Sequence, residues 1–114
     1  ATSEKLAIAH LLDGHVSAVV GTHTHIPTSD HRVLVNGTAY ITDVGMSGDY
    51  NSVIGMEKEA AISRFQHPNK KQPRLTVADG SPTLCGVIIN SKKNGLAESI
   101  KPIRIGGVID NIGI

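Results

Sequence analysis

The sequence predicts an α/β fold, and two observations support this prediction. First, a helical pattern over residues 2–12 leads through Asp13-Gly14 into the apolar run 16–20, and helix followed directly by apolar strand is typical of α/β proteins. Second, the remainder of the chain is rich in strand patterns, beginning with a hairpin around Asn36-Gly37. With 114 residues, the chain has the length of one small domain.

Composition narrows the class of protein. Hydrophobic residues make up 39% of the chain and aromatic residues only 3%, so a core has to be built from Val, Ile, Leu and Ala. The net charge of +1 gives neither a basic footprint for nucleic acid nor an acidic tail. The single cysteine, Cys85, excludes a disulfide framework and is most simply a small buried residue in a reducing compartment. No apolar run approaches the ~20 residues that span a bilayer, so we expect a cytoplasmic protein with no membrane partner.

The amino-terminal helix is predicted over residues 2–12, because Leu6, Ala9 and Leu12 recur at helical spacing and Asp13-Gly14 ends the pattern. Residues 16–20 are predicted to form a buried central strand, because apolar side chains occupy both faces. Such a strand needs neighbours on both sides. A free edge would pair with another chain, which predicts a homo-oligomer.

The next elements are predicted from turn sequences. Asn36-Gly37 between strand patterns at 32–35 and 38–41 favours a two-residue type I′ hairpin, in which both central residues have positive φ. A glycine-rich loop follows the hairpin, and a second helix is predicted over 57–66, ending before Pro68. Turn sequences then separate three predicted strands of an antiparallel meander, at residues 74–78, 83–90 and 99–105.

Two histidines follow the first strand, in the order Gly21-Thr22-His23-Thr24-His25. Residues two apart in extended backbone point to the same side, so the sequence predicts that His23 and His25 aim at one point beyond the carboxyl end of the strand. Open α/β sheets usually bind their ligands there, and imidazole is a common metal ligand. The pair therefore predicts a metal site, with a hydrogen-bonded structural pair as the alternative. Two histidines are only part of such a site, because a catalytic metal normally has at least three protein ligands.

Asp43 is a second candidate, because it ends the second hairpin strand. Its carboxylate can bind a metal, orient a ligand histidine or cap a loop, and loop capping is slightly favoured. The chain contains no Gly-x-Ser-x-Gly elbow, phosphate loop or dinucleotide fingerprint. The other histidines are interpreted as structural or surface residues: His10, His15, His31 and His67.

Gly21-Thr22-His23-Thr24-His25 resembles the last metal-binding motif of the calcineurin-like metallophosphoesterases. Together with the segments 16–28, 37–46 and 52–59, it makes residues 1 to about 105 similar to the YmdB-like branch of that family. The resemblance implies a four-layer α/β/β/α sandwich that holds two metal ions, Fe, Mn or Zn. It also implies a binuclear phosphodiesterase that hydrolyses cyclic nucleotides or related phosphoesters.

The resemblance further implies that His23 and His25 are metal ligands and that Thr22, Thr24 and Asp43 lie beside the site, where they bind substrate. The family's other ligands and its general acid lie upstream. Residues 1–114 are therefore expected to be the carboxyl-terminal portion of a single metallophosphoesterase domain, with the upstream half as partner, and to be inactive alone. The alternatives are a small non-catalytic metal-binding domain and an interaction module without metal.

Overall fold

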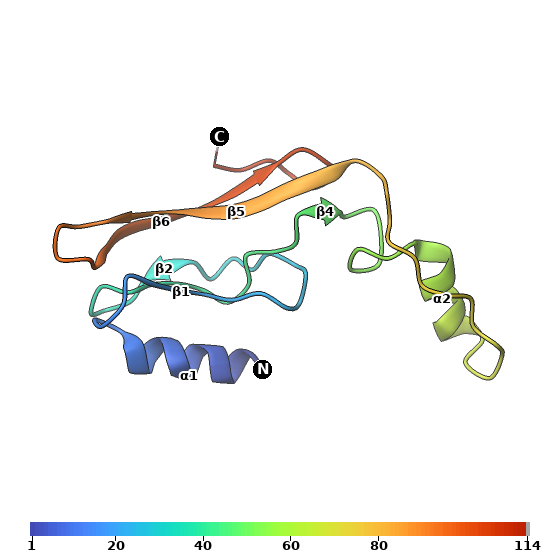
Figure 1. Ribbon diagram of the computed structural model, residues 1–114, viewed down its shortest axis with the longest axis horizontal. Helices are drawn as coiled ribbons and strands as arrows, with labels where there is room; N and C mark the ends of the chain where they lie inside the picture. The colour runs from blue at the N-terminus through green and yellow to red at the C-terminus, as the bar shows by residue number, and fades with distance from the viewer. Residues whose placement is uncertain (114) are drawn as a thin grey trace.

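The computed structural model describes residues 1–113, which form a mixed α/β structure with two three-stranded sheets (Figure 1). This agrees with the predicted α/β class. In chain order the elements are α1 (Thr2–Leu12), β1 (Ala18–Val20), β2 (Arg32–Val33), β3 (Ala39–Ile41), β4 (Gly48–Asp49), α2 (Lys58–Gln66), β5 (Pro82–Ser91) and β6 (Ala97–Ile105).

The first sheet has the strand order β1-β3-β2, with β1 parallel to β3 and β2 antiparallel to it. Helix α1 packs on this sheet through a small core in which Ala9 meets Leu34 and Tyr40, with Leu6 and Val19 beside them. All three residues of β3 are buried, whereas Val20 of β1 is 48% exposed. Within residues 1–113, β3 takes the central position and β1 lies at the edge, so the second neighbour that residues 16–20 were predicted to need is not among the described strands.

The hairpin between β2 and β3 is confirmed, but its turn is not type I′. The N–H of Gly37 donates to the Leu34 carbonyl at 2.9 Å, and the N–H of Leu34 donates to the Thr38 carbonyl at 2.8 Å. Gly37 has a φ of 102°, and Asn36 is not among the residues with positive φ. A tertiary contact explains the difference, since the carboxylate of Asp13 accepts the N–H groups of Asn36 and Thr38 at 3.0 and 3.2 Å.

The two helices lie close to their predicted ranges. Helix α1 covers residues 2–12 as expected, and α2 begins one residue after the predicted start at residue 57. Helix α2 buries only Ala60 and Ala61. Across the described part of the chain, neither helix combines the length and the apolar character needed to cross a membrane.

The second sheet has the order β4-β5-β6, and the antiparallel pairing of β5 with β6 confirms two of the predicted meander strands. Strand β4 was not predicted and pairs with the start of β5. The third predicted strand, at 74–78, is wrong, since only Val77 forms a bridge, to Met56. This segment bonds the 55–57 loop instead of β5, with the N–H of Ala78 donating to the Gly55 carbonyl at 2.8 Å.

The elements form an elongated arrangement. In Figure 1, α1, the first sheet and the β5–β6 hairpin lie in three successive layers. Helix α2 lies apart from these layers, at the right-hand end of the long axis. The radius of gyration is 17.3 Å, whereas a compact domain of this length would have about 13 Å. The buried core beneath α1 is correspondingly small.

Candidate metal-binding site

The candidate site lies where the parallel strands β1 and β3 end side by side. The N–H of Gly21 donates to the Ile41 carbonyl at 3.0 Å, and the N–H of Val44 donates to the Gly21 carbonyl at 2.9 Å. A Cβ at position 21 would lie 1.9 Å from the carbonyl oxygen of Thr42. Glycine is therefore required here, and this close approach brings the loop 22–25 against the loop 42–45.

The backbone of the two histidines is not extended, contrary to the prediction. His23 has a φ of 107° and His25 a φ of 71°. In residues 1–113 the only other non-glycine residue with positive φ is Ile54. Backbone conformations of this kind cost free energy and concentrate at functional sites. The chain thus concentrates its backbone strain around the histidine loop and the residue that contacts it.

Ile54 is the hydrogen-bond partner of His25. The Nδ1 atom of His25 lies 2.7 Å from the Ile54 carbonyl oxygen. Because a carbonyl only accepts, Nδ1 carries the proton and Nε2 keeps its lone pair. Metal-ligating histidines usually hold their second nitrogen in this way, so the donor set fits a metal of the Fe, Mn or Zn type.

His23 is exposed, and the His25 side chain is partly buried. Residues 1–113 bring no group of three or more His, Cys, Asp or Glu side chains together in a way that could hold a metal ion. In the described chain, the pair is therefore not completed by a third ligand.

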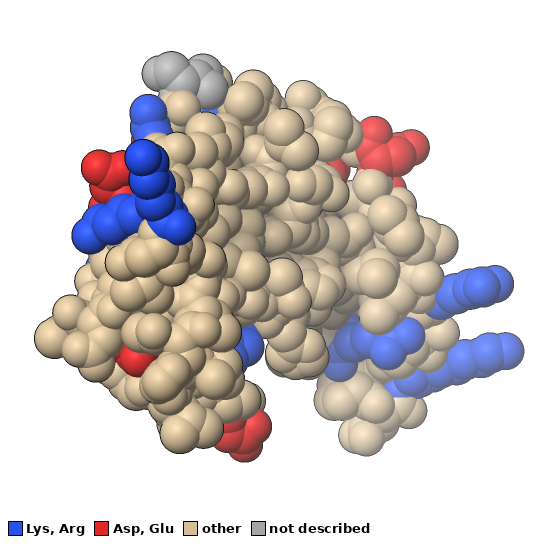
Figure 2. All heavy atoms as spheres, turned by 60° about the vertical axis from the view of Figure 1, so that its left-hand side comes forward, with Lys and Arg blue, Asp and Glu red and all other residues tan. Residues whose placement is uncertain are grey.

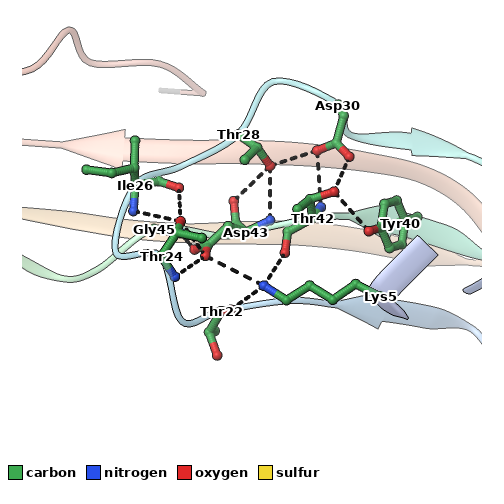
Figure 3. Close-up of polar contacts among 10 residues, drawn as sticks. All are labelled: Lys5, Thr22, Thr24, Ile26, Thr28, Asp30, Tyr40, Thr42, Asp43 and Gly45. Atoms are coloured by element: carbon green, nitrogen blue, oxygen red, sulfur yellow. Dashed lines mark hydrogen bonds and ion pairs between the residues drawn. The ribbon is translucent and has the colours of Figure 1, made fainter. Parts of the chain in front are cut away.

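Asp43 binds the histidine loop through Thr24, which stands between the two histidines (Figure 3). Its fully buried carboxylate accepts the N–H and the hydroxyl of Thr24, both at 2.7 Å, on Oδ2. Its Oδ1 accepts the N–H of Gly45 at 2.9 Å, and the ammonium group of Lys5 lies 3.9 Å from Oδ2. Thr24 stands between the two histidines, so these are the contacts of the loop-capping role that the sequence slightly favoured.

The Asp43 carboxylate is charged despite its burial. Burial raises the pKa of Asp43, but the hydrogen bonds from Thr24 and Gly45 and the charge of Lys5 outweigh it, so the pKa lies below 3.8. A buried charge that keeps its hydrogen bonds and a counter-charge is tolerated. The histidine loop is therefore bonded to a buried, negatively charged Asp43 carboxylate.

Three further residues of this network were not found from the sequence: Lys5, Thr28 and Asp30. Lys5 reaches from α1 to the Thr22 and Thr42 carbonyls, and so joins the ends of β1 and β3. The Thr28 hydroxyl donates to Asp30 at 2.7 Å, and Asp30 also accepts the N–H of Thr42 at 3.1 Å. The only sequence signal was the recurrence of Thr and Asp in residues 22–30 and 42–43, and this recurrence does not indicate which side chain bonds which partner.

The fold and the site together define the class of protein: a mixed α/β protein with a histidine loop at the carboxyl ends of two parallel strands. The family model described as "YmdB-like protein" matches residues 1–103. The chain therefore belongs to the YmdB-like family, as the resemblance of its motifs indicated.

Similar proteins include a phosphodiesterase and two proteins of known structure. The chain is 56% identical over 90 residues to the 2′,3′-cyclic-nucleotide 2′-phosphodiesterase of Bacillus subtilis, covering 79% of this chain and 33% of that protein. A hypothetical protein from Thermus thermophilus superposes with a TM-score of 0.85 at 44% identity, covering 95% of this chain and 42% of that one. A novel phosphatase from Mycoplasma pneumoniae superposes with a TM-score of 0.84 at 37% identity, covering 93% of this chain and 38% of that one. The chain thus spans about a third of the curated relative's length.

Proposed function

We propose that this chain belongs to a metal-dependent phosphodiesterase that hydrolyses 2′,3′-cyclic nucleotides or related phosphoesters. In this proposal His23 and His25 are ligands of a binuclear site that holds Fe, Mn or Zn. The observation that carries the proposal is the hydrogen bond between Nδ1 of His25 and the Ile54 carbonyl, which orients the ring in a strained loop at the carboxyl ends of parallel strands. The activity named for the Bacillus subtilis relative supports the substrate class.

The domain is proposed to be a four-layer α/β/β/α sandwich, of which residues 1–114 form the carboxyl-terminal portion. The elongated shape and the small core support this, because the chain buries little by itself. The order of α1, the first sheet and the β5–β6 hairpin matches three such layers. The remaining ligands, and the acid that protonates the leaving group, would come from the upstream half of the same protein.

Each residue of the loop has a role in this proposal. His23 and His25 would hold the ions, and bound ions would lower the pKa of water and stabilise the negative charge of the transition state. Thr22 is exposed and its hydroxyl is available to a phosphoester oxygen, whereas the Thr24 hydroxyl donates its proton to Asp43, so Thr24 is proposed to shape the substrate side of the exposed loop. Asp43 serves the substrate through Thr24, whose N–H and hydroxyl it accepts.

The test uses the protein at the full length of its relatives. We expect His23→Ala and His25→Ala each to lower the metal content and to reduce hydrolysis of 2′,3′-cyclic AMP by at least about 100-fold, while circular dichroism shows an intact fold. His10→Ala is the matched control, because His10 is exposed on α1 and should leave both readouts unchanged. Unchanged metal content and activity in both loop variants would refute the proposal.

The second candidate function is a small non-catalytic metal-binding domain, which would need further ligands from outside residues 1–113, since these bring no third ligand beside the pair. In that case, loss of either histidine should unfold the domain, since a structural metal contributes folding energy. Under the main proposal, the 114-residue chain alone should fail to hydrolyse cyclic nucleotides with Mn added, because it has only part of the site. Turnover by this polypeptide would contradict the division of the site between two halves. The cytoplasmic location expected from composition stays a prediction.

A further inference from the structure

A hollow of about 230 Å³ adjoins His25 and lies between the 46–56 loop and residues 77–78. Four apolar side chains line it: Met46, Ile54, Met56 and Val77. Two of them are well exposed, Ile54 by 51% and Val77 by 74%. The fold thus presents an apolar surface directly beside the candidate metal ligand. On the face that Figure 2 shows, most lysine and arginine atoms lie in two groups with mainly uncharged atoms between them.

Small residues and backbone bonds keep the hollow open. Gly48, Gly55 and Ala78 line it without filling it, and a Cβ at Gly55 would lie 3.2 Å from the sulfur of Met46. The Gly55 carbonyl accepts the N–H of Ala78 at 2.8 Å, which fixes the two walls relative to each other. Asp49 anchors the loop, since its carboxylate accepts the N–H of Gly80 at 3.0 Å. The hollow is therefore largely preformed, as binding pockets usually are.

The hollow and the histidine loop meet at His25 and its hydrogen-bond partner Ile54. The Ile54 carbonyl fixes the His25 ring, while its side chain lines the hollow, and His25 itself forms part of the lining. A molecule whose phosphate lies at the histidine loop would therefore place its neighbouring group at the hollow. This continuity indicates which part of a substrate the hollow can receive.

We propose that the hollow binds the nucleobase of a nucleotide substrate; this proposal rests on the proposed function and deepens it. Its volume is below the roughly 300–1,000 Å³ of pockets that enclose whole drug-sized ligands, which suits a single ring system. The thioethers of Met46 and Met56 make favourable contacts with flat aromatic rings. The buried carboxylate of Asp49 in the lining disfavours a second phosphate. Apolar walls of this kind contact the faces of a base but do not form hydrogen bonds with the polar groups on its edge, so weak discrimination between bases is expected.

Photolabelling tests the subsite independently of catalysis. In the full-length protein, 8-azidoadenosine 3′-monophosphate should label peptides that contain the 46–56 loop or Val77, and 2′,3′-cyclic AMP should compete. Mass spectrometry of the digested protein locates the label. Labelling confined to other segments, or no competable labelling, would overturn the subsite whether or not the protein hydrolyses phosphodiesters.

A substitution that fills the hollow tests its part in catalysis. Gly48→Val suits this purpose, because Gly48 does not have a positive φ and a Cβ there meets the Met46 sulfur at an ordinary 3.7 Å. We expect the KM for 2′,3′-cyclic AMP to rise about tenfold with kcat unchanged, since contacts in an apolar pocket are worth factors of this order. Kinetics with glycerol 1,2-cyclic phosphate, which has no base, should not change.

Gly86→Val is the matched control, because Gly86 has open space around its Cβ position and lies outside the hollow. Equal effects of Gly48→Val on both substrates, or no effect on either, would overturn the proposal. If the unsubstituted protein hydrolyses neither substrate, the proposed function fails, and the photolabelling result alone then decides whether the subsite exists.

Discussion

Gly21→Ala should be the most damaging small substitution at the end of β1. The added Cβ would lie 1.9 Å from the Thr42 carbonyl oxygen, whereas ordinary contact begins at 3.4 Å, so the atoms would have to separate by 3.4 − 1.9 = 1.5 Å. This movement breaks the bonds that Gly21 makes with Ile41 and Val44. Two hydrogen bonds contribute about 1 kcal/mol each, and overpacking costs about 1–3 kcal/mol. The expected loss in the free energy of unfolding is therefore about 3–5 kcal/mol.

Urea unfolding of the full-length protein, followed by circular dichroism, measures this loss. Gly86→Ala is the matched control, because no atom lies within 4 Å of its Cβ position, and it should cost little. We also expect Gly21→Ala to lower metal content, since the carboxyl ends of β1 and β3 hold the histidine loop. A variant as stable as the parent protein would refute the reasoning that close backbone approach at Gly21 positions the site.

Three further predictions concern the carboxylates of Asp30 and Asp43 and the free sheet edge. Burial raises the pKa of Asp30, but hydrogen bonds from Thr42 and Thr28 outweigh it and hold the pKa below 3.8. The charged Asp30 therefore stabilises the fold fully at pH values above 3.8, and this contribution is lost as the pH falls through the folded-state pKa. Asp30→Asn should consequently flatten the decline in unfolding free energy below about pH 4. An unchanged pH profile of stability would contradict this. Asp43→Ala leaves buried N–H groups without their acceptor and should cost about 2–4 kcal/mol in thermal unfolding, with Asp43→Asn milder; a loss of a few tenths would be inconsistent with the loop-capping role. The isolated 114-residue chain should be oligomeric in light scattering, because β1 has a free edge in the described residues, and a monodisperse monomer would argue against it.

Local sequence patterns predicted the elements that depend on residues close together in the sequence. Helix α1 and the paired strands β5 and β6 form close to their expected ranges, because helical periodicity and turn residues are properties of neighbouring positions. The strand β1 followed by glycine and two histidines also located the candidate site, since parallel strands place their carboxyl ends at one edge.

Local patterns failed where a distant residue decided the conformation. Asn36-Gly37 favoured a type I′ turn, but Asp13 accepts two N–H groups of that turn and selects another geometry. Residues 74–78 have strand-forming side chains, yet they bond the 55–57 loop, so only one bridge forms.

The sequence by itself determined which residue types stand at the site: His23 and His25, with Thr24 between them, directly after β1. Only the tertiary structure decided how they are held. The partner of His25 is a carbonyl 29 residues away, and the loop rests on Asp43, 19 residues beyond Thr24. The physical reason is that positive φ at the histidines is unfavourable locally and persists only where distant hydrogen bonds compensate for it. Such compensation cannot be read from spacing along the chain.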